Sequence, residues 1–260
     1  MFSSLSNVRL IVGVKTVFVT ILALVSMGVC THFQIRADFP LTLISTAIIF
    51  PIVFSIGGAY KRREAALGQY GSIKAHGRAI YFAVRDWLPE SDQEGQDKVA
   101  GLLGDLMENM RTLFTNTSEE MSTNEKAVYG SFAELSRFIK NELRGKGLPG
   151  GECSRCNQFL SKMMIAFENT KHIYQYRTPR SLRAYSDFFI VLLPILYGPY
   201  FAASSAEYSH PGLGYVMAAL FAFILCGLDN IQFHLENPFD QIGTDDVAIN
   251  AEKFVSSLSA

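Results

Sequence analysis

A CxxC pair is the constellation in this chain whose residue types and spacing could most readily do chemistry. Cys153 and Cys156 follow a glycine-rich segment, and this spacing occurs both in zinc sites and in redox-active dithiols. A structural zinc takes four ligands, and the sequence has no second pair of this kind. We therefore expect an ordinary loop with free thiols and no bound metal, with a redox-sensitive pair as the alternative.

Enzyme chemistry has little support elsewhere in the sequence. None of the histidines lies centrally in an apolar run, so no ligand pair is available for a haem between membrane helices. There is no phosphate-cradling glycine loop, no nucleophile elbow, and no stripe of mixed basic and aromatic residues for nucleic acid. The sequence thus predicts a protein without catalytic residues, cofactor or nucleic-acid partner. The histidines are His32, His76, His172, His210 and His234.

The elements that must position any site are long apolar runs. The net charge of −1 and 18% charged residues resemble those of a soluble domain, but the apolar residues are clustered. A membrane helix needs about 20 mostly apolar residues, and four runs qualify. Only Lys15 among them is charged, and we expect it to reach toward the lipid headgroups. The runs are Leu10–Cys30, Phe39–Tyr60, Phe188–Ala206 and Pro211–Leu228.

Basic residues near the ends of these runs predict their orientation. They follow the second run and precede the third, whereas the two short connections contain only Arg36. Because positive charge stays on the cytoplasmic side, both termini and the long middle segment are expected there. The expected domains are residues 1–60 with the first two spans, 61–186 as a cytoplasmic helical region, 187–230 with the last two spans, and 231–260 as a cytoplasmic segment.

The middle segment is polar but carries the helical period. Apolar residues recur at intervals of three and four positions, whereas strand alternation is scarce. The second run continues into this region as a long helix that reaches Trp87. The sequence therefore predicts an all-α membrane protein whose span helices extend into a cytoplasmic helical layer. The other expected helices cover Val99–Leu113, Ala127–Leu143 and Asn157–Tyr176.

The second run has one face of interest. Phe50 and Phe54 are one helical turn apart, and Thr46 lies one turn earlier on the same face. Pro51 cannot donate to the carbonyl of Ala47, which leaves an acceptor free or hydrated. In a symmetric oligomer such side chains would form rings that gate by dewetting. Packing against lipid or between helices is the other interpretation of this spacing.

The end of the fourth run carries a family resemblance. Residues 227–250 read GLDNIQFHLENPFDQIGTDDVAIN. They resemble the end of the last membrane helix of the bestrophin anion channels, in which G-L-D is followed by E-[DN]-P-F and an acidic stretch. The matching residues are Asp229, Glu236, Asn237, Pro238, Phe239, Asp245 and Asp246. Around the second run, Phe54 to Gly71 is similar to a bacterial bestrophin block, although the paired tryptophans of that block are missing.

The resemblance implies a fold and a function. Bestrophins are passive anion channels, and the family's pentameric assembly implies a homo-oligomer here. The frame places Phe54 at the last position of the family's pore neck, Phe50 at the middle one, and Thr46 where an aliphatic residue is usual. Expected partners are membrane lipids, other copies of the chain, and small anions such as chloride or bicarbonate.

Calcium binding distinguishes the animal bestrophins from the bacterial ones, and the sequence bears on this difference. Animal bestrophins bind calcium with carboxylates after Asn-Pro-Phe, and here Asp245 matches one such position while Ile242 occupies another. Calcium takes about six to eight oxygen ligands, so the sequence is closer to the calcium-independent bacterial members. The plain interpretation of Asp245 and Asp246 is a helix cap or a loop tether.

Two other functions remain open from the sequence. The chain could be a membrane-anchored scaffold or sensor whose cytoplasmic helices bind a partner, with the CxxC as the sensor. It could also be a cation-conducting relative, because acidic mouths favour cations and Asp38 and Glu207 lie in the short outer connections, where Arg36 opposes them.

Overall fold

The computed structural model describes residues 12–38, 41–116, 118–177, 179–207, 212–240 and 246–259, with only the backbone of 41–44, 118 and 206–207. All regular secondary structure in these ranges is helical, which confirms the all-α prediction. The main helices are α2 (Val14–His32), α3 (Leu41–Asp86), α4 (Gln93–Thr115), α5 (Met121–Arg137), α6 (Gly150–Gln175), α7 (Arg180–Leu196), α8 (Gly198–Glu207), α9 (Leu213–Glu236) and α10 (Ala251–Ser256).

The chain divides into two compact units. The first comprises Met1–Lys61 and Arg177–Asn237, and the second comprises Arg62–Tyr176 and Pro238–Ala260. Helix α3 carries residues of both units, as expected for a second apolar run that continues into a long helix. The cytoplasmic placement of both termini and of the middle segment stays a prediction.

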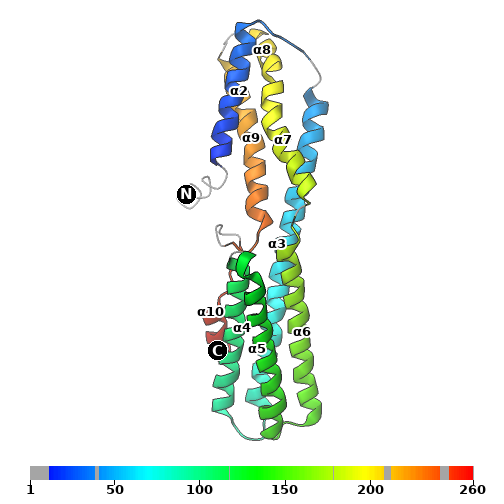
Figure 1. Ribbon diagram of the computed structural model, residues 1–260, viewed down its shortest axis with the longest axis vertical. Coiled ribbons are helices and arrows are strands. Elements are labelled where there is room, and N and C mark those ends of the chain that lie inside the picture. Colours follow the sequence, from blue (N-terminus) through cyan, green and yellow to red (C-terminus); the bar gives the residue numbers. More distant parts are fainter. Residues whose placement is uncertain are drawn as a thin grey trace. The chain divides into compact units, whose positions relative to one another are not determined.

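The first unit is built from the apolar helices. Helix α2 packs against α7, α8 and α9, and Figure 1 shows α2 beside α9. Val19, Ile52 and Ala222 are fully buried in one shared cluster. Within the described residues, the stretches long and apolar enough to cross a membrane are Val14–His32, part of Gly150–Ser205, and Leu213–Glu236. The residues 39–44 that begin the second apolar run lie outside the described side chains, so the count of four spans stays a prediction.

The third apolar run is not one continuous helix, contrary to expectation. Helix α7 ends at Leu196 and α8 starts at Gly198. Pro199 lacks an N–H and so cannot continue the ladder of backbone hydrogen bonds. Gly198 lies against α2, because a Cβ there would come within 3.1 Å of the backbone of Ser26. The break therefore lets α8 approach α2 closely at a position where only glycine fits.

The second unit is a helical bundle formed by residues 62–86 of α3 with α4, α5 and α6, and α10 packs on α4. Helix α4 begins after Asp92, whose carboxylate accepts the Gly95 N–H at 3.0 Å, a typical N-cap. Between α5 and α6, Phe138–Leu143 forms a π-helical turn. The predicted middle helices are therefore present, with α6 starting earlier than expected.

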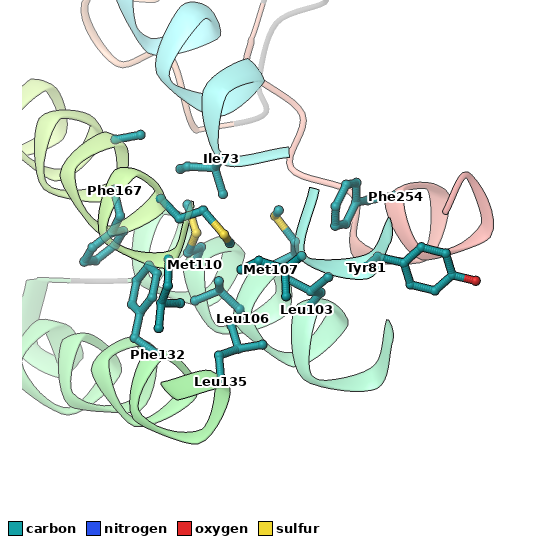
Figure 2. Packing of buried hydrophobic residues seen from close by; sticks show 14 of the residues in the cluster. Ile73, Tyr81, Leu103, Leu106, Met107, Met110, Phe132, Leu135, Phe167 and Phe254 are labelled. Carbon is teal, nitrogen blue, oxygen red and sulfur yellow. The ribbon is translucent and has the colours of Figure 1, made fainter. Parts of the chain in front are cut away.

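The core of this bundle has contributions from every helix. Figure 2 shows Leu103, Leu106, Met107 and Met110 of α4 meeting Phe132 of α5, with Phe167 of α6, Ile73 of α3 and Phe254 of α10 around them. Burying each such side chain contributes roughly 1.5–3 kcal/mol. A folded bundle therefore supports the second half of α3.

Candidate functional site

Phe50 and Phe54 lie on the outer face of α3 in the isolated chain. Their exposed fractions are 59% and 63%, and their rings meet edge to face with centroids 4.6 Å apart. Ile48, Ile52 and Ala59, on the opposite face, are buried in the first unit. The two phenylalanines therefore do not pack between helices of their own protomer.

The exposed face of α3 continues on both sides of the two rings. Thr46, one turn before Phe50, is exposed, and so are Val53 and Gly57. The face thus combines bulky rings with a hydroxyl and a glycine. The outward residues of α2, by contrast, are mostly large and aliphatic, for example Val17, Ile21 and Val25.

Pro51 has the predicted consequence for the backbone, but the freed acceptor has a partner. The hydroxyl of Tyr185 on α7 donates to the carbonyl of Ala47 at 3.4 Å. The carbonyl that Pro51 cannot satisfy therefore has a side-chain partner on another helix. This long hydrogen bond ties α7 to α3 beside the two phenylalanines.

An ionic cluster joins three helices of the first unit. The Lys15 ammonium on α2 donates to Asp187 of α7 at 2.5 Å and to Asp229 of α9 at 2.7 Å. Next to it, Asn230 donates to the hydroxyl of Thr16 at 3.1 Å. Two carboxylates from other helices therefore satisfy the charge of Lys15, while the expectation that it reaches toward the headgroups stays a prediction. Asp229, the aspartate of the G-L-D motif, has a side chain only 16% exposed.

Glu236 forms a second ion pair in the same unit. Its carboxylate is nearly buried and accepts from Arg183 of α7 at 2.9 Å. The guanidinium of Arg183 also lies over the ring of Phe233, 5.0 Å from its centroid. The motif residue at the end of α9 is thus held by a cation one turn inside α7.

Asn237, Pro238 and Phe239 end α9 and lead into the second unit. Asn237 caps α9 with an extended backbone, and its buried Oδ1 finds no partner among the described residues. The carbonyl of Pro238 accepts from the N–H of Val247 at 2.7 Å. Phe239 is 1% exposed and stacks on Phe114 with ring centroids 4.7 Å apart. Phe239 therefore anchors this segment in the core of the second unit.

The acidic pair is only partly described. Asp245 and Ile242 lie outside the described residues, whereas Asp246 is half-buried just before Val247. Within the part of the chain that the structure describes, there is no group of three or more histidine, cysteine or acidic side chains that could hold a metal. The expected independence from calcium stays a prediction.

The CxxC residues lie in the first turns of α6, not in a loop. Pro149 precedes the helix, and Gly150 and Gly151 are its first residues. A proline is favourable at the start of a helix. Cys153 and Cys156 are both buried free thiols. Burial raises the pKa of Cys156 to about 11, so its thiolate is scarce near neutral pH. This environment argues against the sensor role.

Comparison with known proteins decides the fold. No family model and no curated protein matches the sequence. Crystal structures of a bacterial bestrophin homologue from Klebsiella pneumoniae do match. A variant with a tyrosine replaced by alanine has a TM-score of 0.74 and 14% identity over 94% of this chain and 97% of that one. A variant with an isoleucine replaced by threonine has a TM-score of 0.69, also with 14% identity, over 94% and 97%.

The chain has a bestrophin-like fold. A crystal structure described only as that of a membrane protein matches equally broadly, with a TM-score of 0.72 and 14% identity over 95% of this chain and 98% of that chain. The bestrophin-like fold expected from residues 227–250 is therefore confirmed along nearly the whole chain. At 14% identity the comparison establishes the fold alone. The roles of Thr46, Phe50, Phe54 and the motif residues stay predictions.

Sequence reasoning missed the partners that surround the bestrophin-like motif. Three of them lie on α7: Asp187 shares Lys15 with Asp229, Arg183 pairs with Glu236, and Tyr185 contacts α3. One signal was available, because an aspartate next to an apolar run requires a cation. Lys15 is the cation in the first run, but its pairing with two helices distant in sequence depends on the tertiary structure.

Proposed function

We propose that this chain is the subunit of a passive anion channel, with chloride or a similar monovalent anion such as bicarbonate as the permeant ion. The neck is formed by Phe50 and Phe54 of α3, with Thr46 one turn away, repeated around the axis of a homo-oligomer. The chain lies in a membrane with four spans and both termini in the cytoplasm.

One observation carries the proposal: the two rings are exposed on a helix whose opposite face is buried. Large apolar side chains that are more than half exposed in their own chain must face lipid, another copy, or the lumen of a pore. Two features favour the pore. Pro51 and Gly57 interrupt the aliphatic character of this face, and phenyl rings present partly positive edges that favour anions.

Assembly is needed because one protomer offers no closed axial path. A cyclic oligomer would turn each exposed phenylalanine into a ring of side chains around the axis. Apolar rings of this kind gate by dewetting, so permeation would depend on the width of the neck. The bestrophin-like fold is consistent with such an assembly.

The neck is tested by replacing both phenylalanines with alanine. Because their side chains are exposed in the protomer, we expect Phe50→Ala/Phe54→Ala to leave the melting temperature of the purified protein within a few degrees. The wider neck should admit water more readily and raise chloride efflux from reconstituted vesicles. Reversal potentials in planar bilayers under a chloride gradient would measure anion over cation preference in the same preparation.

A matched control uses two phenylalanines on other helices. Phe18 on α2 and Phe223 on α9 are 57% and 40% exposed, and Phe18→Ala/Phe223→Ala removes the same side-chain volume. This control should leave efflux unchanged. Equal efflux from both double variants would overturn the neck assignment, and a reversal potential that follows the cation gradient would favour the cation-conducting alternative.

A further inference from the structure

A hollow in the second unit is lined by cations and hydroxyls. Its volume is about 430 Å³, and it lies between α3 and the C-terminal segment around α10. The charged residues that line it are Lys74, Arg78 and Lys253, and no acidic residue of the described chain lines it. The positive charge of this lining favours an anionic occupant.

The spacing of residues along α3 produces the hollow. Tyr70, Lys74 and Arg78 recur every four residues, so they share one face of the helix. Gly71 and Ala75, beside them, are the smallest residues available and leave room between the longer side chains. A Cβ added at Gly71 would meet nothing within 4 Å, so the space next to the helix is open.

The opposite wall is held in place by contacts that do not use the charges. Phe254 of α10 is buried in the core of the second unit (Figure 2). The backbone N–H of Asn250 donates to the hydroxyl of Tyr70 at 3.3 Å, and Asn250 in turn caps α10 by accepting the N–H of Lys253 at 2.7 Å. These contacts hold the C-terminal segment against α3 and α4.

Several donors remain available toward the hollow. Arg78 has five N–H donors, of which one nitrogen donates to Ser257 Oγ at 2.8 Å and to its carbonyl at 3.3 Å. Tyr70 accepts from Asn250 and so keeps its own O–H for another acceptor. Burial raises the pKa of Tyr70, which keeps that proton in place.

The three cations have no ion-pair partner within the described residues. Lys171, Lys146 and Lys98 of the same unit pair with carboxylates. The ammonium of Lys74 lies instead over the ring of Tyr70, 4.5 Å from its centroid. Glu252, the acid nearest Lys253 in sequence, lines a separate hollow with Arg111.

We propose that this cavity binds a phosphate group that carries at least two negative charges, with Lys74, Arg78 and Lys253 as its cationic ligands and Tyr70 as a further donor. Charge-assisted hydrogen bonds of this kind suit phosphate oxygens, and arginine adds a planar fork. A monovalent anion such as chloride can use fewer of these donors. The cavity is separate from the proposed neck, and its test does not depend on conduction.

Isothermal titration of the purified oligomer in neutral detergent with sodium pyrophosphate, at fixed ionic strength, tests the site. The main variant is Lys74→Gln/Lys253→Gln, because the core contacts of Phe254 and the hydrogen bonds of Arg78 remain. We expect its dissociation constant to rise at least about tenfold. The control, Lys126→Gln/Lys140→Gln, removes the same charge from two exposed lysines of the same unit and should bind as the parent does.

A second arm separates the sources of the phosphate group. Native mass spectrometry after incubation with phosphatidic acid, compared with phosphatidylcholine, reports whether a lipid headgroup occupies the cavity. Binding of pyrophosphate that the main variant loses supports a soluble ligand, and binding of phosphatidic acid alone with the same loss supports a lipid. Absence of binding by both probes, or equal binding by the parent and the main variant, overturns the proposal.

Discussion

Individual charges in the first unit differ in how strongly the fold depends on them. Lys15 lies between two carboxylates, but Asp229 is 16% exposed whereas Asp187 is 50% exposed. An exposed ion pair contributes little, about 0–1 kcal/mol, because solvent screens it. A carboxylate removed from water depends on its cation, since leaving a buried partner unsatisfied costs more. Asp229 is therefore the partner that matters.

Amide substitutions test this ranking. Asp229→Asn should lower the free energy of unfolding by roughly 1–3 kcal/mol, while Asp187→Asn should lower it by less than about 1 kcal/mol. Unfolding of the detergent-solubilised protein by SDS, followed by circular dichroism, measures both, and Lys15→Met shows whether their effects share one partner. Equal losses from the two amides would contradict the ranking.

The sequence allowed some of these residues to be found and not others. Phe50 and Phe54 could be singled out because a helical period places them on one face, and the fold confirms that they share it. Their exposure could not be predicted, since periodicity says which residues align and not which side faces the core. The two partners of Lys15 could not be predicted, because they lie on helices more than 170 residues away.

At the scale of elements, helix continuity was predicted better than helix interruption. The long α3 follows from an apolar run that passes directly into an amphipathic one. The break between α7 and α8 depends on the close approach of Gly198 to α2, and a hydropathy pattern carries no information on such contacts. The early start of α6 has a local cause, because Pro149 suits the position before a helix and the glycines after it tolerate helical geometry.

Phe239 links the end of α9 to the second unit by burial, and its loss should be costly. Truncating a buried phenylalanine costs about 3–5 kcal/mol, so Phe239→Ala should lower the free energy of unfolding by that amount. It should also increase hydrogen exchange in the segment from Val247 to α10. Deuterium uptake followed by mass spectrometry resolves this segment from the rest of the chain.

Phe233, six residues earlier and still on α9, provides the control for that prediction. It is 53% exposed, and its contact with Arg183 is a cation–π interaction worth about 0.5–1 kcal/mol at an exposed site. Phe233→Ala should therefore leave exchange in the C-terminal segment unchanged. A comparable loss of protection from both variants would show that the stacking of Phe239 on Phe114 does not hold the segment.

On the scale of the whole molecule, the first unit leaves much apolar surface uncovered. Phe18 and Ile21 on α2, Phe50 and Phe54 on α3, and Val216 on α9 are more than half exposed in the single chain. Lipid can cover the outer faces of such helices, but a pore requires that one face be enclosed by further copies. The proposed channel thus depends on closed cyclic assembly.

Native mass spectrometry in mild detergent tests that dependence. We expect one dominant closed oligomer, a pentamer if the assembly follows the bestrophin-like fold, because heterologous contacts between identical subunits must close into a ring to avoid open polymers. The Phe50→Ala/Phe54→Ala variant should keep the same oligomer, since rings that face a lumen contribute little to subunit contacts. A parent protein found only as monomers or dimers would favour the scaffold function. An oligomer that the double variant loses would place the two phenylalanines in the subunit interface, where they could not form a neck.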